Sequence, residues 1–540
     1  MTTTRKFVWM ALLAISLPIL SHGQGAATGD LHVSVKDPKG STVTNATIRV
    51  QDPAKGFERS STANTEGEYR ILALPPGKYT VTVEAPGFSK VEVNNVAVSV
   101  GQLGELPVTL SVAGAQEVVN VNAEAELVET QRSSSTNTID ERRIDSLPIN
   151  GRNYINFALT DSRLARDDAP SIGAAPTSGL NASGQRARAN LVNVDGFDSV
   201  DNSTNGIRST LSQEGVQEFQ IQTNSYSAEY GRASGGVVNI ITRSGTNDMH
   251  GSVFGYLRNR AFQAVNPFST VSDPAYTRVQ AGTALGGPII KDKTYFYFSY
   301  EGTWRQETGF SSIGADNFGL SPFDASAFLG LPPQSYVIQA TTPQIQFLSS
   351  IPPGTPGSDQ YVVLVGRASG MALNGAWPGP PLLGGGVSGF PTSCTVPPCF
   401  VPPSFVTLNS LIGNFPVSER TDLYSLRIDH NISSTNRLSL SGGVSPSDQT
   451  GIQVQAQGPQ NFGQNAFSRT STQNFHDFYV GGSDQWTIGA NKVNEFGFRY
   501  SRRGLLYSFS RAPGGGNVAV NIPGFAFFGR EPFSFVDRTE

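Results

Sequence analysis

The chain has 540 residues, more than one hydrophobic core usually supports, so two or more domains are expected. Its net charge of −4 and its charged fraction of 15% exclude the basic stripe of a nucleic-acid-binding protein. An aromatic fraction of 10% excludes general disorder, while 58 glycines and 34 prolines favour short strands with many turns. The expected fold class is therefore mainly β.

Residues 1–23 have the pattern of a signal peptide. Arg5 and Lys6 precede a largely apolar run over 7–20, and Ser21 and Gly23 occupy the −3 and −1 positions of a cleavage site. The run is shorter than a membrane-spanning helix, although an uncleaved anchor is the alternative interpretation. Because no other run of about 18 apolar residues occurs in the sequence, a membrane protein of this kind would cross as a β-barrel.

Residues 29–112 predict a small β-sandwich, because short alternating runs recur about every 8–12 residues between Gly/Pro turns. The phrases VKDPKGSTVTNATIRV and TEGEYRILALPPGKYTVTVEAPGF resemble the carboxypeptidase regulatory-like domain, a transthyretin-type sandwich. The residues that carry the resemblance are Asp37, Gly40, Ala46, Gly67, Tyr69, Leu74, Pro76, Gly77, Tyr79, Ala85, Gly87 and Phe88. The five histidines have no zinc-binding spacing, so we expect a binding or spacing module without a metal and without peptidase activity.

Residues 113–130 form a polar hinge around the β-prone run EVVNV. One interpretation is a last strand followed by a linker. The other is a segment to which another protein adds a strand, with main-chain hydrogen bonds providing the affinity.

Residues 131–247 predict an α+β domain. We expect a short helix, a turn over 148–153 and another helix, followed by a strand over 191–194 that ends in the turn DGFD. Two further strands follow, and the last is the β-branched run GGVVNIIT, in which Gly235 and Gly236 permit a bulge or a close approach of the backbone.

This domain resembles the plug of TonB-dependent outer-membrane receptors, which ends in a phrase of the type YG…GGVINIITK. The matching residues are Tyr230, Gly231, Gly235, Gly236, Val237, Val238, Asn239, Ile240, Ile241, Thr242 and Arg243, and the phrases LPINGRN and VDGFD are also similar. With a sandwich in front, the arrangement is similar to receptors that carry a regulatory-like extension. The resemblance implies a TonB box between extension and plug, formed by Glu117, Val118, Val119, Asn120 and Val121, in which Asn120 departs from the best-marked boxes.

Residues 248–540 predict the first part of a transmembrane antiparallel β-barrel. Polar and apolar residues alternate over 423–429 and 495–500. Arg427 and Asp429 are expected to face the lumen, because a charge on the lipid face costs about 2–4 kcal/mol at mid-depth. The run TYFYFSY after the turn KDK is expected to supply an aromatic band at the membrane interface. An ordinary soluble sandwich is the alternative.

The region 305–416 is rich in Pro, Gly and Ser, which suits long extracellular loops. Cys394 and Cys399 lie there, and a disulfide is favoured over two free thiols after export. A plugged barrel has about 22 strands, but only 293 residues follow Asn247. We therefore expect an incomplete barrel, with a compact barrel of fewer strands as the alternative.

The favoured function is a receptor that binds and imports a nutrient, such as a saccharide, a peptide or a siderophore-like ligand, when TonB rearranges the plug. Its expected partners are TonB, outer-membrane lipid and the nutrient. An outer-membrane structural or adhesion protein is the alternative. An enzyme is not expected, because there is no nucleophile elbow and no phosphate-binding loop. Asp195, Asp198 and Asp201 lack the Glu that closes an EF-hand, so we expect a solvated plug loop there and no metal or cofactor.

Overall fold

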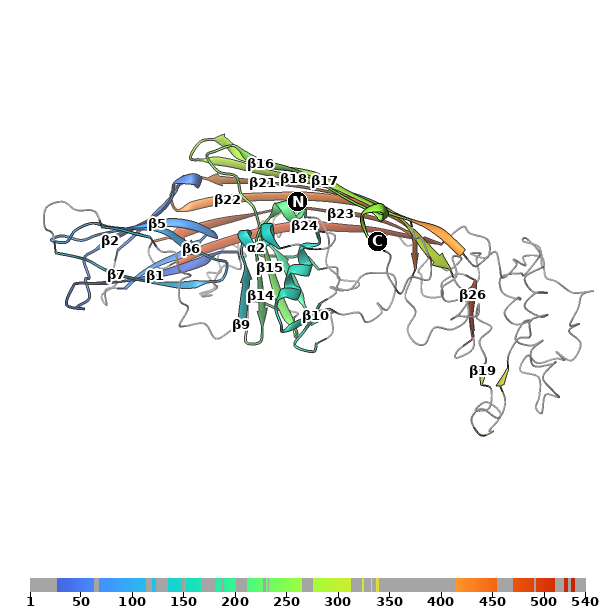
Figure 1. The fold of residues 1–540 in the computed structure, drawn as a ribbon. Helices are drawn as coiled ribbons and strands as arrows, with labels where there is room; N and C mark the ends of the chain where they lie inside the picture. The colour runs from blue at the N-terminus through green and yellow to red at the C-terminus, as the bar shows by residue number, and fades with distance from the viewer. Residues whose placement is uncertain are drawn as a thin grey trace, which may run out of the picture.

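The computed structural model contains three β-rich parts, which we call the sandwich, the inner sheet and the wall sheet (Figure 1). The residues it describes are 27–62, 68–112, 119–122, 135–147, 149, 152–166, 180–185, 189–200, 211–226, 230–231, 233–264, 275–311, 323–324, 332, 337–338, 413–453, 470–489, 492–509, 519–522 and 526–529. Within these ranges, no helix has both the length and the apolar character needed to cross a membrane.

The sandwich consists of two sheets, with strand orders β4-β1-β7 and β3-β2-β5-β6-β8. Its elements are β1 (Gly29–Lys36), β2 (Thr47–Asp52), the 3₁₀ turn η1 (Pro53–Lys55), β3 (Phe57–Thr62), β4 (Glu68–Leu74), β5 (Gly77–Glu84), β6 (Val91–Val98), β7 (Leu103–Thr109) and β8 (Val119–Asn122). As the alternation predicts, Leu31, Val33 and Val35 of β1 are fully buried, and they pack in one core with Val81 and Val83 of β5.

Residues that carry the sandwich resemblance have identifiable structural roles. Tyr69 is fully buried, and its hydroxyl accepts the Ala46 N–H at 2.8 Å and donates to the Val43 carbonyl at 3.0 Å. Gly40 and Gly87 occupy turns with φ of +85°, a conformation that side chains strongly disfavour. These residues therefore shape the sandwich.

The inner sheet has the strand order β13-β12-β15-β14-β9. Its domain contains β9 (Ser135–Ile139), α2 (Glu141–Ser146), η3 (Tyr154–Thr160), β10 (Leu164–Arg166), β11 (Leu180–Ala182), β12 (Leu191–Val194), β13 (Phe197–Asp198), η5 (Gln213–Gly215), β14 (Val216–Thr223) and β15 (Gly236–Thr242). Every residue of β15 is buried, because β12 and β14 flank the strand and both of its faces are covered. The first predicted helix is α2, whereas the second is the 3₁₀-helix η3.

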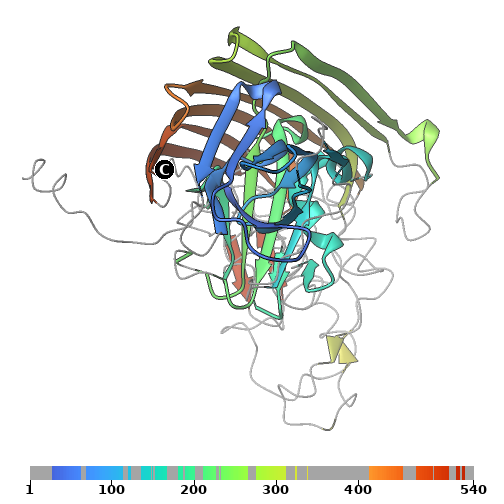
Figure 2. The ribbon, with the colours of Figure 1, turned by 90° about the vertical axis from the view of Figure 1, so that its left-hand side faces the viewer.

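The wall sheet is a run of seven antiparallel strands in the order β16-β17-β18-β21-β22-β23-β24. They are β16 (His250–Asn259), which the short turn η6 (Arg260–Phe262) follows, β17 (Tyr276–Ile290), β18 (Thr294–Ser311), β21 (Gly413–Asn431), β22 (Asn436–Gln453), β23 (Thr470–Ile488) and β24 (Lys492–Phe509). Two separate ribbons pair β19 (Phe323–Asp324) with β20 (Val337–Ile338), and β25 (Ala519–Ile522) with β26 (Ala526–Gly529). Figure 2 shows the wall sheet curving over the inner sheet.

The two faces of the wall sheet differ as the alternation predicts. Phe496, Phe498 and Tyr500 of β24 point outward and are 51–68% exposed, whereas Arg427 and Asp429 of β21 point toward the inner sheet. One expectation is wrong in part. Tyr295 and Tyr297 of the aromatic run are buried on the inner face, so they do not belong to an outward band.

The residues of the phrase that resembles YG…GGVINIITK pack closely around the start of β15. A Cβ on Gly235 would lie 2.6 Å from Asn190 Oδ1, the atom that accepts the Gly236 N–H at 3.0 Å. The Asn239 amide donates to the hydroxyl of the buried Tyr230 at 3.1 Å. These glycines therefore leave room for a side chain that caps the start of β15.

We expect Gly235→Ala to destabilise the inner sheet by about 1–3 kcal/mol, because the displaced Asn190 no longer accepts the Gly236 N–H. The measurement is the rate of limited proteolysis within the inner sheet of the full-length protein in detergent micelles. Gly231→Ala is the matched control, since a Cβ there meets no atom within 4 Å. Equal rates for the two variants would contradict this role.

Candidate functional site

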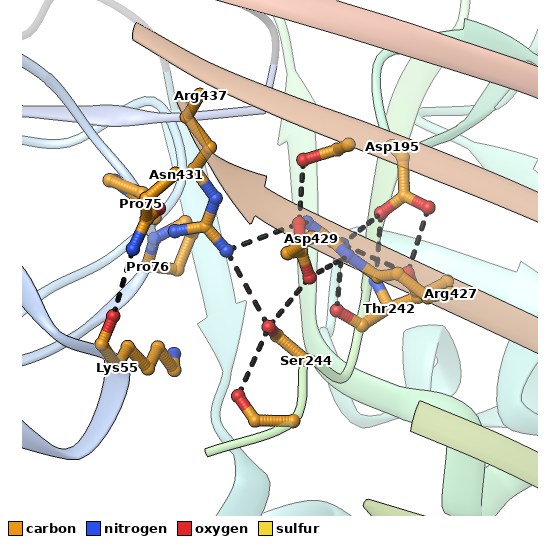
Figure 3. A network of polar contacts seen from close by, with 12 residues as sticks. Lys55, Pro75, Pro76, Asp195, Thr242, Ser244, Arg427, Asp429, Asn431 and Arg437 are labelled. Atoms are coloured by element: carbon orange, nitrogen blue, oxygen red, sulfur yellow. Dashed lines mark hydrogen bonds and ion pairs between the residues drawn. The ribbon is translucent and has the colours of Figure 1, made fainter. Parts of the chain in front are cut away.

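The inner sheet, the wall sheet and the sandwich meet at a polar junction (Figure 3). Its centre is Arg427, whose place in the alternation of β21 directs it inward. Nε and Nη2 of Arg427 donate to the two carboxylate oxygens of Asp429 at 2.9 and 3.0 Å. Nη1 donates to Asp195 at 3.1 Å and to the carbonyl and hydroxyl oxygens of Thr242, both at 3.0 Å. Because a guanidinium has five N–H donors in fixed directions, one side chain binds both the wall sheet and the inner sheet.

Asp195 reaches this junction from the tight turn between β12 and β13. Asp195 and Gly196 have φ of +51° and +82°, the left-handed pair that a two-residue hairpin of type I′ requires. The Asp195 carboxylate also accepts the N–H and hydroxyl of Thr242, at 2.9 and 2.8 Å. The expectation of a solvated loop is therefore wrong for Asp195, whose side chain is 14% exposed and ion-paired, while Asp198 is exposed and Asp201 lies outside the described residues.

Asp429 is the most buried charge of the junction, with 1% of its surface exposed. It accepts hydrogen bonds from the hydroxyls of Ser244 and Ser439, each at 2.6 Å, and Arg437 lies 3.1 Å away. Two arginines and two aspartates thus balance in charge across the junction. Such balance is needed because an unpaired buried charge costs several kcal/mol.

A second polar cluster joins the inner domain to strands β16 and β18 of the wall sheet. Arg152 has φ of +51°, and its guanidinium pairs with Glu214 at 2.9 Å and with Glu301 of β18 at 3.3 Å. It also lies over the ring of Phe254 of β16, 4.1 Å from the centroid. Ser212 donates to the same Glu301 at 2.8 Å. Both clusters therefore join the inner domain to the wall sheet through charged hydrogen bonds.

The sandwich contacts the wall sheet through η1. Asn247, at the end of the inner domain, donates its N–H to the Ala54 carbonyl at 2.7 Å and its amide to Asp292 at 2.7 Å. Asn431 donates to the Lys55 carbonyl at 3.2 Å. Asp292 and Asn431 lie at short turns of the wall sheet, so η1 docks where strands of the wall turn back.

Close backbone contact makes this docking specific. Gly56 has φ of +52°, and a Cβ there would lie 2.6 Å from the Asp292 Cα, so only glycine fits. Burial lowers the pKa of the adjacent Lys55 side chain, and the carboxylate of Asp52, 4.0 Å away, offsets this lowering only in part. The backbone of η1 therefore forms the docking contact.

Two cavities lie beside these clusters. One of about 60 Å³ lies at the junction itself. The other, of about 190 Å³, is lined by the charged side chains of Arg152, Arg278, Glu301, Arg305 and Glu419, together with uncharged polar side chains and the apolar Leu211 and Leu423. Charges of both signs in this cavity suit a polar ligand. Within the described ranges, no three His, Cys, Asp or Glu side chains group as a metal site requires.

The structure describes only part of the segment predicted as a TonB box, and neither cysteine of the predicted disulfide. Val119–Asn122 forms β8 at the edge of the sandwich, whereas Glu117 and Val118 lie outside the described residues. Cys394 and Cys399 also lie outside them.

Sequence reasoning placed some residues of the site and missed others. The inward direction of Arg427 and Asp429 is confirmed. What predicted it was that both charged residues fall on one face of a strand with alternating polar and apolar residues. Arg152 stands in the phrase LPINGRN and Glu301 follows the run TYFYFSY, but neither was predicted as a site residue. Their pairing joins positions 149 residues apart, and no local pattern reports it.

Comparison with known proteins identifies the wall sheet. The model of the family described as outer membrane beta barrel domain matches residues 241–534, more than half of the chain. The chain belongs to this family. The protein is accordingly located in the outer membrane, and the wall sheet is part of its barrel domain. A second family model, the carboxypeptidase regulatory-like domain, matches residues 30–111 and confirms the sandwich resemblance.

One curated relative and several solved structures are similar to this barrel-domain protein. The TonB-dependent transporter Oar of Myxococcus xanthus is 26% identical over 354 residues, which is 63% of this chain. The chain spans about a third of the length of that relative (32%). The outer membrane transporter YddB from Escherichia coli is 8% identical with a TM-score of 0.41, and the match covers 74% of this chain and 43% of YddB. The ferric enterobactin receptor PfeA from Pseudomonas aeruginosa is 13% identical with a TM-score of 0.37, over 68% and 41%.

We expect Arg427→Met to weaken the attachment of the inner sheet by about 3–5 kcal/mol, because Asp195 loses its ion pair and Asp429 keeps only Arg437. The measurement is the urea concentration at which the inner sheet of the full-length protein becomes sensitive to protease. Arg420→Met on the same strand is the control, since Arg420 is 67% exposed and its ion pair with Asp422 is worth about 0–1 kcal/mol. An Arg427 variant that behaves like the Arg420 variant would refute the central role of Arg427.

Proposed function

We propose that this chain is a TonB-dependent receptor that binds and imports a nutrient across the outer membrane. In this proposal the inner domain, residues 131–247, is a plug, residues 248–540 are barrel, and residues 113–130 link the plug to the sandwich. The observation that carries the proposal is the polar character of the contact between inner sheet and wall sheet. The name of the relative Oar supports the dependence on TonB.

A polar contact suits a part that must move. Besides the two ion-pair clusters, Tyr297 donates to the Glu214 carbonyl at 2.9 Å, and Arg499 donates to the Val194 carbonyl at 3.1 Å. Water can replace such partners when the surfaces separate, whereas separating apolar surfaces costs about 25 cal/mol per Å². The plug is therefore held in one position by specific bonds and can leave it without exposing an apolar core.

The position of the sandwich supports its placement on the periplasmic side. The wall strands connect through short turns at the end where η1 docks, such as that at Asp292, and barrels of this kind have their short turns in the periplasm. The cavity beside Arg152 lies farther along β18 and β21, away from this end. A nutrient that enters from outside would reach this cavity before it reached the junction.

The nutrient in this proposal is a saccharide, a peptide or a siderophore-like compound. The cavity beside Arg152 supports a polar ligand, because cations and carboxylates line it together. A structural or adhesion protein of the outer membrane is the rival, and it requires neither TonB nor movement of the plug.

We expect deletion of residues 117–121 to abolish import, because the energy-coupling partner then has no strand to bind. A strain lacking the protein is first grown on a panel of saccharides, peptides and ferric siderophores to find the nutrient that requires it. Growth of the deletion variant on that nutrient is then compared with growth of the intact protein. Undiminished growth, with the protein present in the outer membrane, would rule out TonB-dependent transport.

A disulfide between inner domain and wall sheet tests whether the plug must move. A Cβ on Gly215 would lie 3.8 Å from the Cβ of Ser299, the mean separation in disulfides. In a background without native cysteines, oxidised G215C/S299C is expected to stop growth on the same nutrient, and reduction is expected to restore it.

The control for this disulfide shares one of its positions. Ser299 and Ser425 are register partners within the wall sheet, and their hydroxyls are 2.7 Å apart. Oxidised S299C/S425C joins two wall strands and leaves the plug free, so growth should continue. Equal growth of both oxidised variants would argue that import needs no separation of plug and wall at Gly215.

A further inference from the structure

The segment Val119–Asn122 is already a strand in this structure. It forms β8, which pairs in parallel with β6, and the register partners are Val91 with Val119, Glu92 with Asn120, Val93 with Val121, and Asn94 with Asn122. The chain reaches this place from β7, since the Ser89 N–H donates to the Ser111 carbonyl at 2.8 Å just before β6 begins. The sandwich therefore extends its second sheet with the hinge.

β8 is the last strand of the order β3-β2-β5-β6-β8, and no described strand pairs with its other side. A strand at a sheet edge presents a row of unpaired N–H and C=O groups, to which another strand can add. Because β6 holds β8 extended, a partner that pairs with it meets a strand that has already lost conformational entropy.

We propose that the sandwich presents β8 as a preformed docking edge, and that the energy-coupling partner binds by adding its strand to the free side of β8 while β8 stays paired with β6. This inference rests on the proposed function, because it takes the partner to be TonB. It differs from the simpler view in which the hinge is an unstructured tether that the partner captures.

The contacts of the sandwich give this arrangement a mechanical consequence. The Val100 N–H, beyond the end of β6, donates to Glu218 at 2.9 Å, and the Val100 carbonyl accepts from Gln220. Gln217 donates to the Pro76 carbonyl at 2.9 Å. All three partner residues belong to β14, next to β9, the first strand of the inner sheet. A load on β8 therefore passes through the sandwich into β14, as well as along the hinge.

The test joins β8 to β6 by the disulfide E92C/N120C, at directly paired positions, in the full chain without native cysteines. The probe is the purified periplasmic domain of TonB from the host, and its affinity is measured with the receptor in detergent micelles. We expect the oxidised variant to bind at least as tightly as the reduced one. A tenfold loss on oxidation that reduction reverses would overturn the proposal, as would failure of the disulfide to form.

The rate of disulfide formation gives a second readout. If the partner adds to the free side of β8, a saturating amount of the TonB domain leaves the rate of oxidation of E92C/N120C unchanged. A tenfold slower oxidation would mean that the partner pulls β8 away from β6, which would contradict the proposal. Q51C/E58C, between β2 and β3 at the opposite edge of the same sheet, is the matched control for the effect of a disulfide in the sandwich. It should alter neither the affinity nor the oxidation rate at β8.

Deletion of residues 119–122 separates this inference from the proposed function. If the deletion abolishes binding of the TonB domain while the oxidised E92C/N120C variant binds, both are supported. If both changes abolish binding, the receptor function stands and the docking edge is refuted. If the deletion leaves binding unchanged, the assignment of this segment as the TonB-binding element fails.

Discussion

The structure depends on the need to balance charge at the buried contact between inner sheet and wall sheet. Arg427 meets that need from the wall, because its guanidinium binds Asp429 on its own strand and Asp195 and Thr242 on the inner sheet. Each charge there is buried only because another compensates it, so the two sheets fit together in one relative position. A contact of this kind gives specificity of position, and its polar groups can take water as partners when the sheets separate.

The same constraint explains the local backbone of the inner domain. The carboxylate that the inner domain directs at Arg427 lies in a tight turn, which Asp195 and Gly196 form in the left-handed region. Arg152, which pairs with Glu301 of β18 in the wall sheet, itself has a left-handed backbone conformation. Backbone conformations that cost energy thus occur where the inner domain contacts the wall, and the bonds they allow offset that cost.

The sandwich links the hinge to both other parts. Its η1 turn docks on Asn247 and the wall turns through backbone contacts, its Val100 binds β14, and its β6 carries the hinge strand β8. In the proposed function, this module, whose sequence has no catalytic pattern, occupies the place where a periplasmic partner would act on the plug. Under the proposed function, this placement lets a binding or spacing domain contribute to transport without chemistry of its own.

The sequence by itself determined the mainly β class, the sandwich, the wall strands with Arg427 and Asp429 on the inner face, and the β-branched strand β15. These follow from periodicity and turn residues, which are local properties of the chain. Only the tertiary structure decided that Tyr295 and Tyr297 face inward, that Asp195 is paired and not solvated, and that Arg152 meets Glu301. Each of these depends on which segment lies opposite in space. Burial and ion pairing join residues far apart in the chain, so their partners appear only when the sheets pack.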